Sequence, residues 1–372
     1  MNSNNDRLFL DIHILQTVPP SNINRDDTGS PKTAQYGGVR RARVSSQAWK
    51  KAIREYFSKN SDSSNVGIRT MNLVDYIKNK IIELNKDISE ESAKNMAKSV
   101  IEKTGIKLKD EKTKALFFIG EKQAIALANA AINNVDDKIE LQSLLNDNPA
   151  IDIALFGRMV ADDPSLNEDA SSQIAHAIST HAIQTEFDFF TAVDDMQKHD
   201  GAGAGMLGTI EYNSSTLYRY ANVAVHELYR QLGDIESTVN AIKLFVEAFS
   251  NSMPTGKANT FANQTLPQLI IVELRKDRPV NLVNAFEVPV KSKDGYVKES
   301  IRRLFTEENK VKKFVETPIE SCYLSMQDVE VETSLTKLSN FSSKSDLVIV
   351  FSTCFPFSNL AFSVNTYGVN FK

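Results

Sequence analysis

Residues 37–54 read GGVRRARVSSQAWKKAIR, and this stretch predicts a basic strand that leads directly into a helix. The pair Gly37-Gly38 is flexible, the run 39–44 is extended, and Ser45 and Ser46 are both suitable N-caps for the helix that follows. One face of that helix is apolar at helical spacing, with Trp49, Ala52, Ile53, Tyr56 and Phe57. A second face is polar and basic, with Gln47, Lys50, Lys51 and Arg54.

The start of this helix has the chemistry of an anion site. Free backbone N–H groups and the positive end of the helix dipole meet there with the guanidinium groups of Arg40, Arg41 and Arg43. The alternative is a solvated amphipathic helix, which an isolated Lys/Arg face would favour. The combination of basic strand, cap and basic helix instead favours contact with a phosphate backbone.

The composition limits where such a site can lie. The chain has 372 residues, 41% of them hydrophobic and 24% charged, and a net charge of −4, so it is long enough for more than one lobe. Residues 25–59 nevertheless hold nine Lys/Arg against three acids. A basic segment in an acidic protein is a hint of local nucleic-acid binding.

The cysteine content and the hydropathy pattern indicate in which cellular compartment the protein is found. The two cysteines, Cys322 and Cys354, lack metal-ligand spacing, and Asp11 and His13 interrupt the apolar run near the N-terminus. We find no run of 18 apolar residues. We therefore expect a soluble, cytoplasmic protein with no membrane contact, no metal and no cofactor.

The pattern along the chain predicts an α+β fold with an inserted helical lobe. Period-2 alternation over 8–15 is typical of a half-buried strand, and the turn-rich segment 17–38 is expected to be a long loop. Helical patterns dominate 60–150. We place the discontinuous core in 1–58 plus 180–315, the helical lobe in 59–150, a loop region in 151–211, and a C-terminal segment of uncertain role in 316–372.

Several later elements are also predicted. Residues 174–181 and 236–250 are expected to be helices, and 215–228, 268–276 and 284–290 are strand-like. The last thirty residues are rich in Phe, Ser and Val, with a strand expected at Leu347 to Phe351.

A search for catalytic groups gives weak candidates. His176 and His181 lie five residues apart and do not share a helical face. Gly203, Gly205 and Gly208 match G-x-G-x-x-G, but no strand precedes and no helix follows, so we interpret them as a loop.

Two acidic pairs remain, Asp26-Asp27 and Asp194-Asp195. With a divalent metal they could cut RNA, so a metal-dependent ribonuclease is one alternative function. A general single-stranded RNA-binding protein is another. Met159 and the pair Phe189-Phe190 are either ordinary core or residues that stack on bases.

Read together, eight segments resemble the repeated backbone subunit of the type I-E CRISPR Cascade complex, in order and spacing across about 8–310. They are NRDD (24–27), GGVRRARVSSQAWKKAIR (37–54), GIRT (67–70), DIALFGRM (152–159), IAHAISTH (174–181), FDFFTAVDD (187–195), YRYANV (218–223) and NAFEVPVKSKDGY (284–296).

The resemblance implies a modified RRM/ferredoxin-like palm with a helical fingers lobe and a thumb loop. It implies a non-catalytic subunit whose copies form a helical filament on CRISPR guide RNA. The implied partners are the guide RNA, a target DNA strand paired with the guide, further copies of the chain, other Cascade subunits and, indirectly, a recruited nuclease.

By position, the resemblance assigns RNA-binding roles to Arg25, Lys32, Arg41, Ser45, Ser46, Gln47, Lys50 and Lys51. The basic strand and the basic helix face add Arg43 and Arg54 to the predicted RNA-binding residues. Met159 would wedge against the RNA, and Phe189, Phe190 and Thr191 would line the guide and target.

The chain departs from the family pattern at three places. Val39 stands where a lysine is common, and Lys138 is the remaining member of a lysine cluster associated with duplex DNA. The segment from about 318, and most clearly from 344, departs from the pattern expected of the family.

Overall fold

The computed structural model describes residues 7–62, 65–192, 206–327 and 338–340. Its helices are α1 (Ser46–Asn60), α2 (Leu73–Leu84), α3 (Glu90–Lys103), α4 (Glu121–Ile132), α5 (Lys138–Asn146), α6 (Ile151–Phe156), α7 (Val225–Leu232), α8 (Ile235–Asn251), α9 (Ala258–Phe261), α10 (Val297–Val311) and the 3-10 turns η2 (Pro164–Leu166) and η3 (Val283–Phe286).

One large sheet holds most of the strands, in the order β14-β13-β12-β1-β11-β9-β3-β2, with β10 and β8 also paired to β11. These are β1 (Phe9–Ser21), β2 (Thr33–Tyr36), β3 (Val39–Val44), β8 (Ser172–Ile174), β9 (Ala177–Ser179), β10 (Glu186–Ala192), β11 (Met206–Ala224), β12 (Leu269–Arg275), β13 (Glu320–Ser325) and β14 (Leu338–Asn340). Two small ribbons pair β4 (Ile68–Thr70) with β7 (Phe117–Ile119) and β5 (Leu108–Lys109) with β6 (Lys112–Thr113).

The centre of the sheet follows a simple succession. Strand β1, helix α1, strands β9 and β11, helix α8 and strand β12 occur in that order along the chain, and the neighbouring strands pair antiparallel. This is the β-α-β-β-α-β pattern of ferredoxin-like folds. The predicted α+β class, with a large antiparallel sheet, is confirmed.

Strand β1 differs from the prediction because it is covered on both faces. Leu10, Ile12 and Ile14 belong to the core that packs against α1 and α8, whereas Leu15 belongs to the core under η3 and α10. Even Asp11 and His13 are fully buried. A period-2 pattern alone cannot reveal that polar residues face a second layer.

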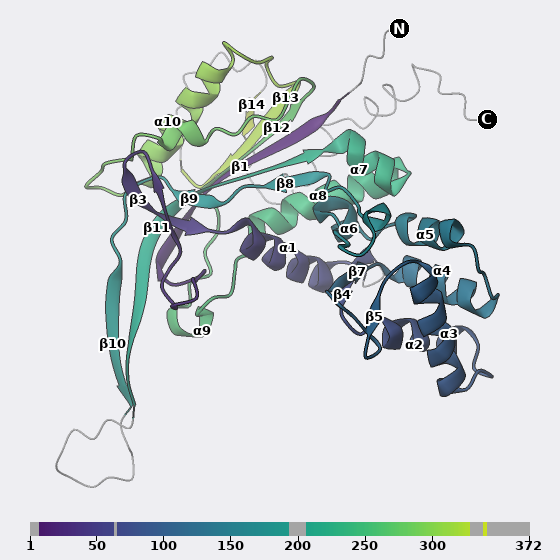
Figure 1. Ribbon diagram of the computed structural model, residues 1–372. Helices are drawn as coiled ribbons and strands as arrows, with labels where there is room; N and C mark the ends of the chain where they lie inside the picture. Colours follow the sequence, from purple (N-terminus) through teal and green to yellow (C-terminus); the bar gives the residue numbers. More distant parts are fainter. Residues whose placement is uncertain (1–6, 63–64, 193–205, 328–337, 341–372) are drawn as a thin grey trace, which may run out of the picture.

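The helices α2 to α5 have a hydrophobic core of their own, centred on residues such as Ile77, Ile101 and Leu127. They form a lobe beside the sheet (Figure 1). The hairpin of β10 and β11 projects away from the sheet on the other side of α1 (Figure 1). Helix α1 therefore lies between two projecting parts of the molecule.

Several predicted elements are wrong. Strand β1 continues to Ser21, with a register shift at Pro19 and Pro20, so the predicted loop begins later and also contains β2. Proline lacks the N–H needed for a regular ladder and is tolerated at such an irregularity. Residues 174–181 form parts of β8 and β9 rather than a helix, because they pair with β11.

The strand predicted at 284–290 is instead the turn η3 followed by irregular chain. The backbone carbonyls of Phe286 and Glu287 accept hydrogen bonds from Arg41, which removes them from any ladder. Gly208 lies in β11 and not in a loop. The remainder of the glycine-rich segment, Asp194-Asp195 and the strand predicted at Leu347 to Phe351 lie outside the described residues.

Within the described ranges, every helix is too short or too polar to cross a membrane.

Candidate nucleic-acid interface

The predicted strand, cap and helix are confirmed. Strand β3 ends at Val44, and the Ser45 side chain accepts a hydrogen bond from the backbone N–H of Ala48 at 3.3 Å. Trp49, Ala52, Ile53 and Phe57 form the buried face of α1. Burial of that face against the sheet turns the basic face of the helix outward.

Two residues predicted to contact RNA have side chains that are buried and hydrogen-bonded inside the protein. Arg41 has 0% of its surface exposed, and its guanidinium donates to the carbonyl oxygens of Tyr36, Ser179, Phe286 and Glu287. Ser45 is also buried, and its hydroxyl caps α1. The Arg41 side chain thus joins β3 to the end of η3, and the Ser45 side chain fixes the start of α1.

The turn before β3 explains why Arg41 is held so firmly. Gly37 adopts φ +58°, and a Cβ atom there would lie 1.6 Å from the carbonyl oxygen of Glu287. Only glycine allows the β2–β3 turn to approach η3 so closely. The sequence predicted a flexible Gly37-Gly38 pair. The structure shows instead that Gly37 is needed because no side chain fits between it and Glu287.

Arg43 and Arg54 are half-buried and have internal partners. Arg43 donates to the carbonyl oxygen of Thr33 and contacts the His176 ring. Arg54 forms an ion pair with the buried Asp152 at 2.8 Å and donates to Gly67 O at 3.0 Å. These two side chains therefore join separate segments of the chain while remaining partly exposed.

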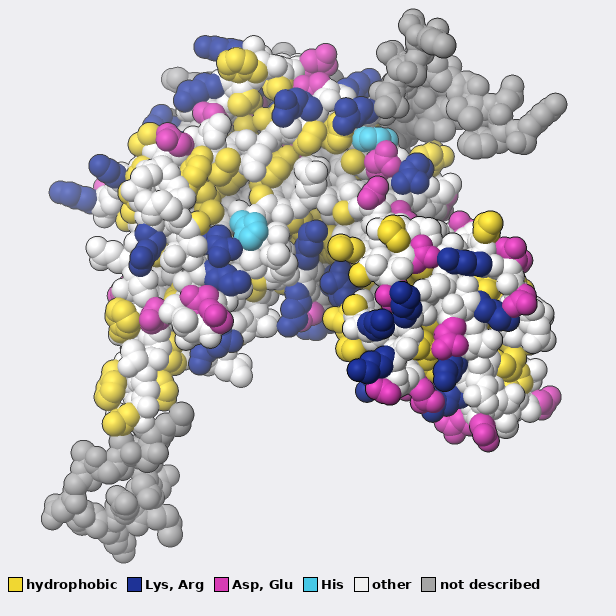
Figure 2. All heavy atoms as spheres, viewed as in Figure 1, with side chains coloured by type: hydrophobic (Ala, Val, Ile, Leu, Met, Phe, Trp, Pro, Cys, Tyr) yellow, Lys and Arg dark blue, Asp and Glu magenta, His cyan; other side chains and the backbone are white. Residues whose placement is uncertain are grey.

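The remaining predicted cations and polar residues reach the surface. Lys51 is the clearest case, with 75% of its side chain exposed and one helical ion pair to Glu55. Arg25 and Gln47 are exposed, and Lys32, Ser46 and Lys50 are half-buried. Figure 2 shows Lys and Arg side chains on the surface between the hairpin and the helical lobe, over α1 and β3.

Arg69 joins this group, although sequence reasoning gave it no role. Its guanidinium lies 4.4 Å from the centroid of the Phe118 ring, and that of Arg54 lies 4.6 Å from the same centroid. Partial burial, and then the charge of Arg69, lower the pKa of Lys50. Cations that disfavour one another in this way form a site that a phosphate would stabilise.

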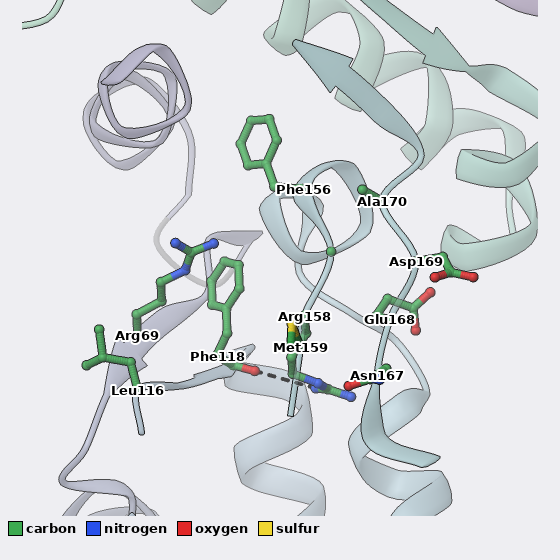
Figure 3. Close-up of a pocket in the computed structure, with 11 residues that line it drawn as sticks. Arg69, Leu116, Phe118, Phe156, Arg158, Met159, Asn167, Glu168, Asp169 and Ala170 are labelled. Atoms are coloured by element: carbon green, nitrogen blue, oxygen red, sulfur yellow. Dashed lines mark hydrogen bonds between the residues drawn. The ribbon is translucent and has the colours of Figure 1, made fainter. Parts of the chain in front are cut away.

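A pocket of about 580 Å³ opens beside these cations. Arg69, Phe118, Leu116 and Met159 line one part of it, and Asn167, Glu168 and Asp169 line another (Figure 3). Met159 is 85% exposed, which excludes the core interpretation. An exposed thioether beside arginines and an open pocket can contact a nucleobase.

The hairpin carries the predicted aromatic segment. Phe189 and Thr191 are exposed, whereas Phe190 is half-buried and packs on Gly208, where a Cβ atom would lie 2.3 Å from its ring. Phe187 was missed, yet it is 65% exposed, as Phe189 is 66% exposed. Strand alternation places Phe187, Phe189 and Thr191 on one face, and this signal was present in the sequence.

Two of the catalytic candidates, Asp26 and His181, are engaged in hydrogen bonds within the protein. Asp26 accepts hydrogen bonds from the N–H groups of Thr28 and Ser30 and from the Thr28 hydroxyl, which lowers the pKa of Asp26. His181 is buried, accepts from the N–H of Thr216 and stacks on Tyr296 at 3.6 Å between ring centroids. Burial lowers the pKa of His181.

Among the described residues, one group has the ligand types and spacing for a metal, namely Asp11, His13 and Glu273. It is buried in the sheet, and Arg275 already pairs with both carboxylates, at 3.3 Å to Asp11 and 2.8 Å to Glu273. It does not lie at the basic surface.

Lys138 is the first residue of α5 and forms an ion pair with Asp163 at 3.0 Å. Its side chain is still largely exposed. The predicted contact with duplex DNA stays a prediction.

Chains similar to this one have been solved as parts of larger complexes. One similar chain comes from a CRISPR RNA-guided surveillance complex, pre-nicking, with 32% identity, a TM-score of 0.81, and coverage of 93% of this chain and 99% of that chain. A second, from a CRISPR RNA-guided surveillance complex, has 29% identity, a TM-score of 0.62, and coverage of 93% and 100%.

The family model of the CRISPR-associated CT1975-like proteins matches residues 10–348, and the chain belongs to that family. The match corrects the expectation that the family pattern ends near 318. Among curated proteins, none matches the chain.

Proposed function

We propose that this chain is a non-catalytic subunit that binds CRISPR guide RNA and forms, with further copies, the backbone of a type I-E Cascade complex. The observation that carries the proposal is the basic surface of α1 with Arg69, framed by the hairpin and the helical lobe. Exposed Lys51 and Gln47, half-buried Lys50 and the nearby Arg69 would supply the phosphate ligands.

Base contacts would come from the two sides of this surface. Met159 stands beside the pocket, and Phe187 and Phe189 stand on the exposed face of the hairpin. Aromatic and thioether side chains bind bases without reading their sequence. Such contacts suit a guide whose sequence varies, since Watson–Crick pairing with the target DNA strand then supplies the specificity.

The shape supports polymerisation. The β10–β11 hairpin and the helical lobe project on opposite sides of α1 (Figure 1). One copy of the chain therefore offers two different projecting surfaces to its neighbours. Contacts between two different surfaces are heterologous, and such contacts generate helical filaments when they do not close a ring. Other Cascade subunits would cap this filament, and a nuclease would be recruited through them.

We expect the number of bound copies to rise in equal steps as the RNA is lengthened. Each copy in a filament covers a fixed length of guide, so each increment of that length admits one more copy. Native mass spectrometry of the chain with single-stranded RNAs of increasing length measures this. A single bound copy at every length, or a gradual rise without steps, would favour a general single-stranded RNA-binding protein.

A further inference from the structure

Arg219 lies directly beneath the basic helix. It belongs to β11, next to β1 at the centre of the sheet, and 1% of its surface is exposed. Its guanidinium carbon is 3.6 Å from the centroid of the Trp49 ring and 4.5 Å from that of Phe249. The cation therefore sits between the buried faces of α1 and α8.

Neutral groups supply the hydrogen bonds of this guanidinium. Nη1 donates to the Gln16 side-chain oxygen at 2.5 Å, and Nη2 donates to the carbonyl oxygen of Phe249. That carbonyl belongs to the last turn of α8, which ends at Asn251, so it carries the partial negative charge of a helix C-terminus. Nε has no acceptor within the described part of the chain.

A full negative charge is missing from this environment. No carboxylate of the described residues forms an ion pair with Arg219, and burial lowers the pKa of Arg219 to about 9. Arg275, on β12 of the same sheet and equally buried, instead pairs with Asp11 and Glu273. Buried cations are ordinarily paired, because an unpaired one costs folding free energy. Arg219 therefore calls for an explanation other than stability.

The charge of the Arg219 guanidinium is close enough to the basic face of α1 to attract an anion bound there. An α-helix with its side chains is about 10 Å across, which is about one Debye length at 0.1 M salt. The protein between them screens less than water does. Trp49, on which the guanidinium stacks, immediately precedes Lys50 and Lys51 in α1.

We propose that Arg219 is a positioning residue for the guide-binding surface, which holds α1 through Trp49 and adds an unneutralised positive charge beneath its basic face. The phosphates of a bound RNA would then complete the charge balance that no carboxylate among the described residues provides. This inference rests on the proposed function, because it assumes that the basic face of α1 binds a polyanion.

Three variants separate the charge from the packing. Arg219→Lys keeps the charge, Arg219→Met fills the site without charge, and Arg219→Gln is neutral but retains an amide donor. At 0.15 M salt we expect the Met and Gln variants to bind a single-stranded RNA roughly three- to tenfold more weakly than the wild type. The Lys variant should stay within about twofold, and the difference should shrink as salt rises. Fluorescence anisotropy over a salt series measures both.

Thermal unfolding of the free variants supplies the second readout. We expect the Tm of the Met variant to be no lower than that of the Lys variant, and added inorganic polyphosphate should raise the Tm less for Met and Gln than for Lys. Equal RNA affinities for Met and Lys, or affinities that simply follow the Tm, would overturn the inference. So would failure of both neutral variants to fold while Lys folds, because the charge would then serve the fold.

The two proposals fail in different ways. A wild-type chain that does not bind RNA refutes the proposed function, whereas wild-type binding without a difference between the Met and Lys variants refutes the role of Arg219 alone.

Discussion

The double charge reversal Lys50→Glu with Lys51→Glu is expected to weaken RNA binding on the order of 100-fold at 0.15 M salt. Both residues follow Trp49 on α1, and Lys51 is 75% exposed. Loss of two phosphate contacts on a single strand should also reduce the slope of log K against log salt by about 1.4. The measurement is a salt titration of RNA affinity.

A matched control is the double variant Lys298→Glu with Lys313→Glu. Both lysines are exposed, in and just after α10, which covers the other face of the sheet. The change in net charge is the same, so we expect affinity near that of the wild type. Unchanged affinity and slope in the Lys50/Lys51 variant, or equal losses in both double variants, would contradict a phosphate contact at α1.

Arg41→Ala is expected to lower the free energy of unfolding by about 3–5 kcal/mol. The substitution leaves a cavity and removes the donor to four backbone carbonyl groups, the shortest of these hydrogen bonds being 2.7 Å to Phe286 O. Urea denaturation of the free protein measures the change.

The neighbouring Arg40 provides the comparison. It is exposed on the same strand, so Arg40→Ala should change the free energy of unfolding by no more than about 0.5 kcal/mol. If Arg41→Ala kept the wild-type midpoint but lost RNA affinity, Arg41 would be a ligand contact as the sequence suggested, and the buried geometry would be wrong.

The contrast between Arg41 and Lys51 shows what could be predicted from the sequence. The helix after Ser45 is a local structure, and its capping serine and 3.6-residue apolar period predict both its start and its solvent face. A strand with basic residues on both faces does not reveal which face another layer will cover. That layer comes from η3 and the turn at Gly37, more than 240 residues apart along the chain.

Contacts between distant segments account for the other omissions. Arg69 and Arg54 lie over the same ring, that of Phe118 in the helical lobe. No local sequence pattern predicts that Phe118 folds back beside α1. Arg219 lies in a strand-like segment, and no residue near it in the sequence predicts that its guanidinium stacks on Trp49. Phe187 differs, since its alternation with Phe189 along the chain is a local pattern that identifies an exposed aromatic face.

The incorrect helix at 174–181 has a related cause. Its Ala and Ile residues suit a helix or a buried strand, and a segment of eight residues is too short for periodicity to decide. Pairing with the long strand β11 decides it, and that strand lies some forty residues further along the chain.

Sequencing the RNA that co-purifies with the chain, expressed together with its partner subunits and a CRISPR array, tests the central claim most directly. We predict RNAs of uniform length, each with a spacer flanked by the same repeat-derived ends, and loss of these RNAs in the Lys50/Lys51 variant. Cellular RNA of mixed sequence and length, or purification free of RNA, would contradict a guide-binding backbone subunit.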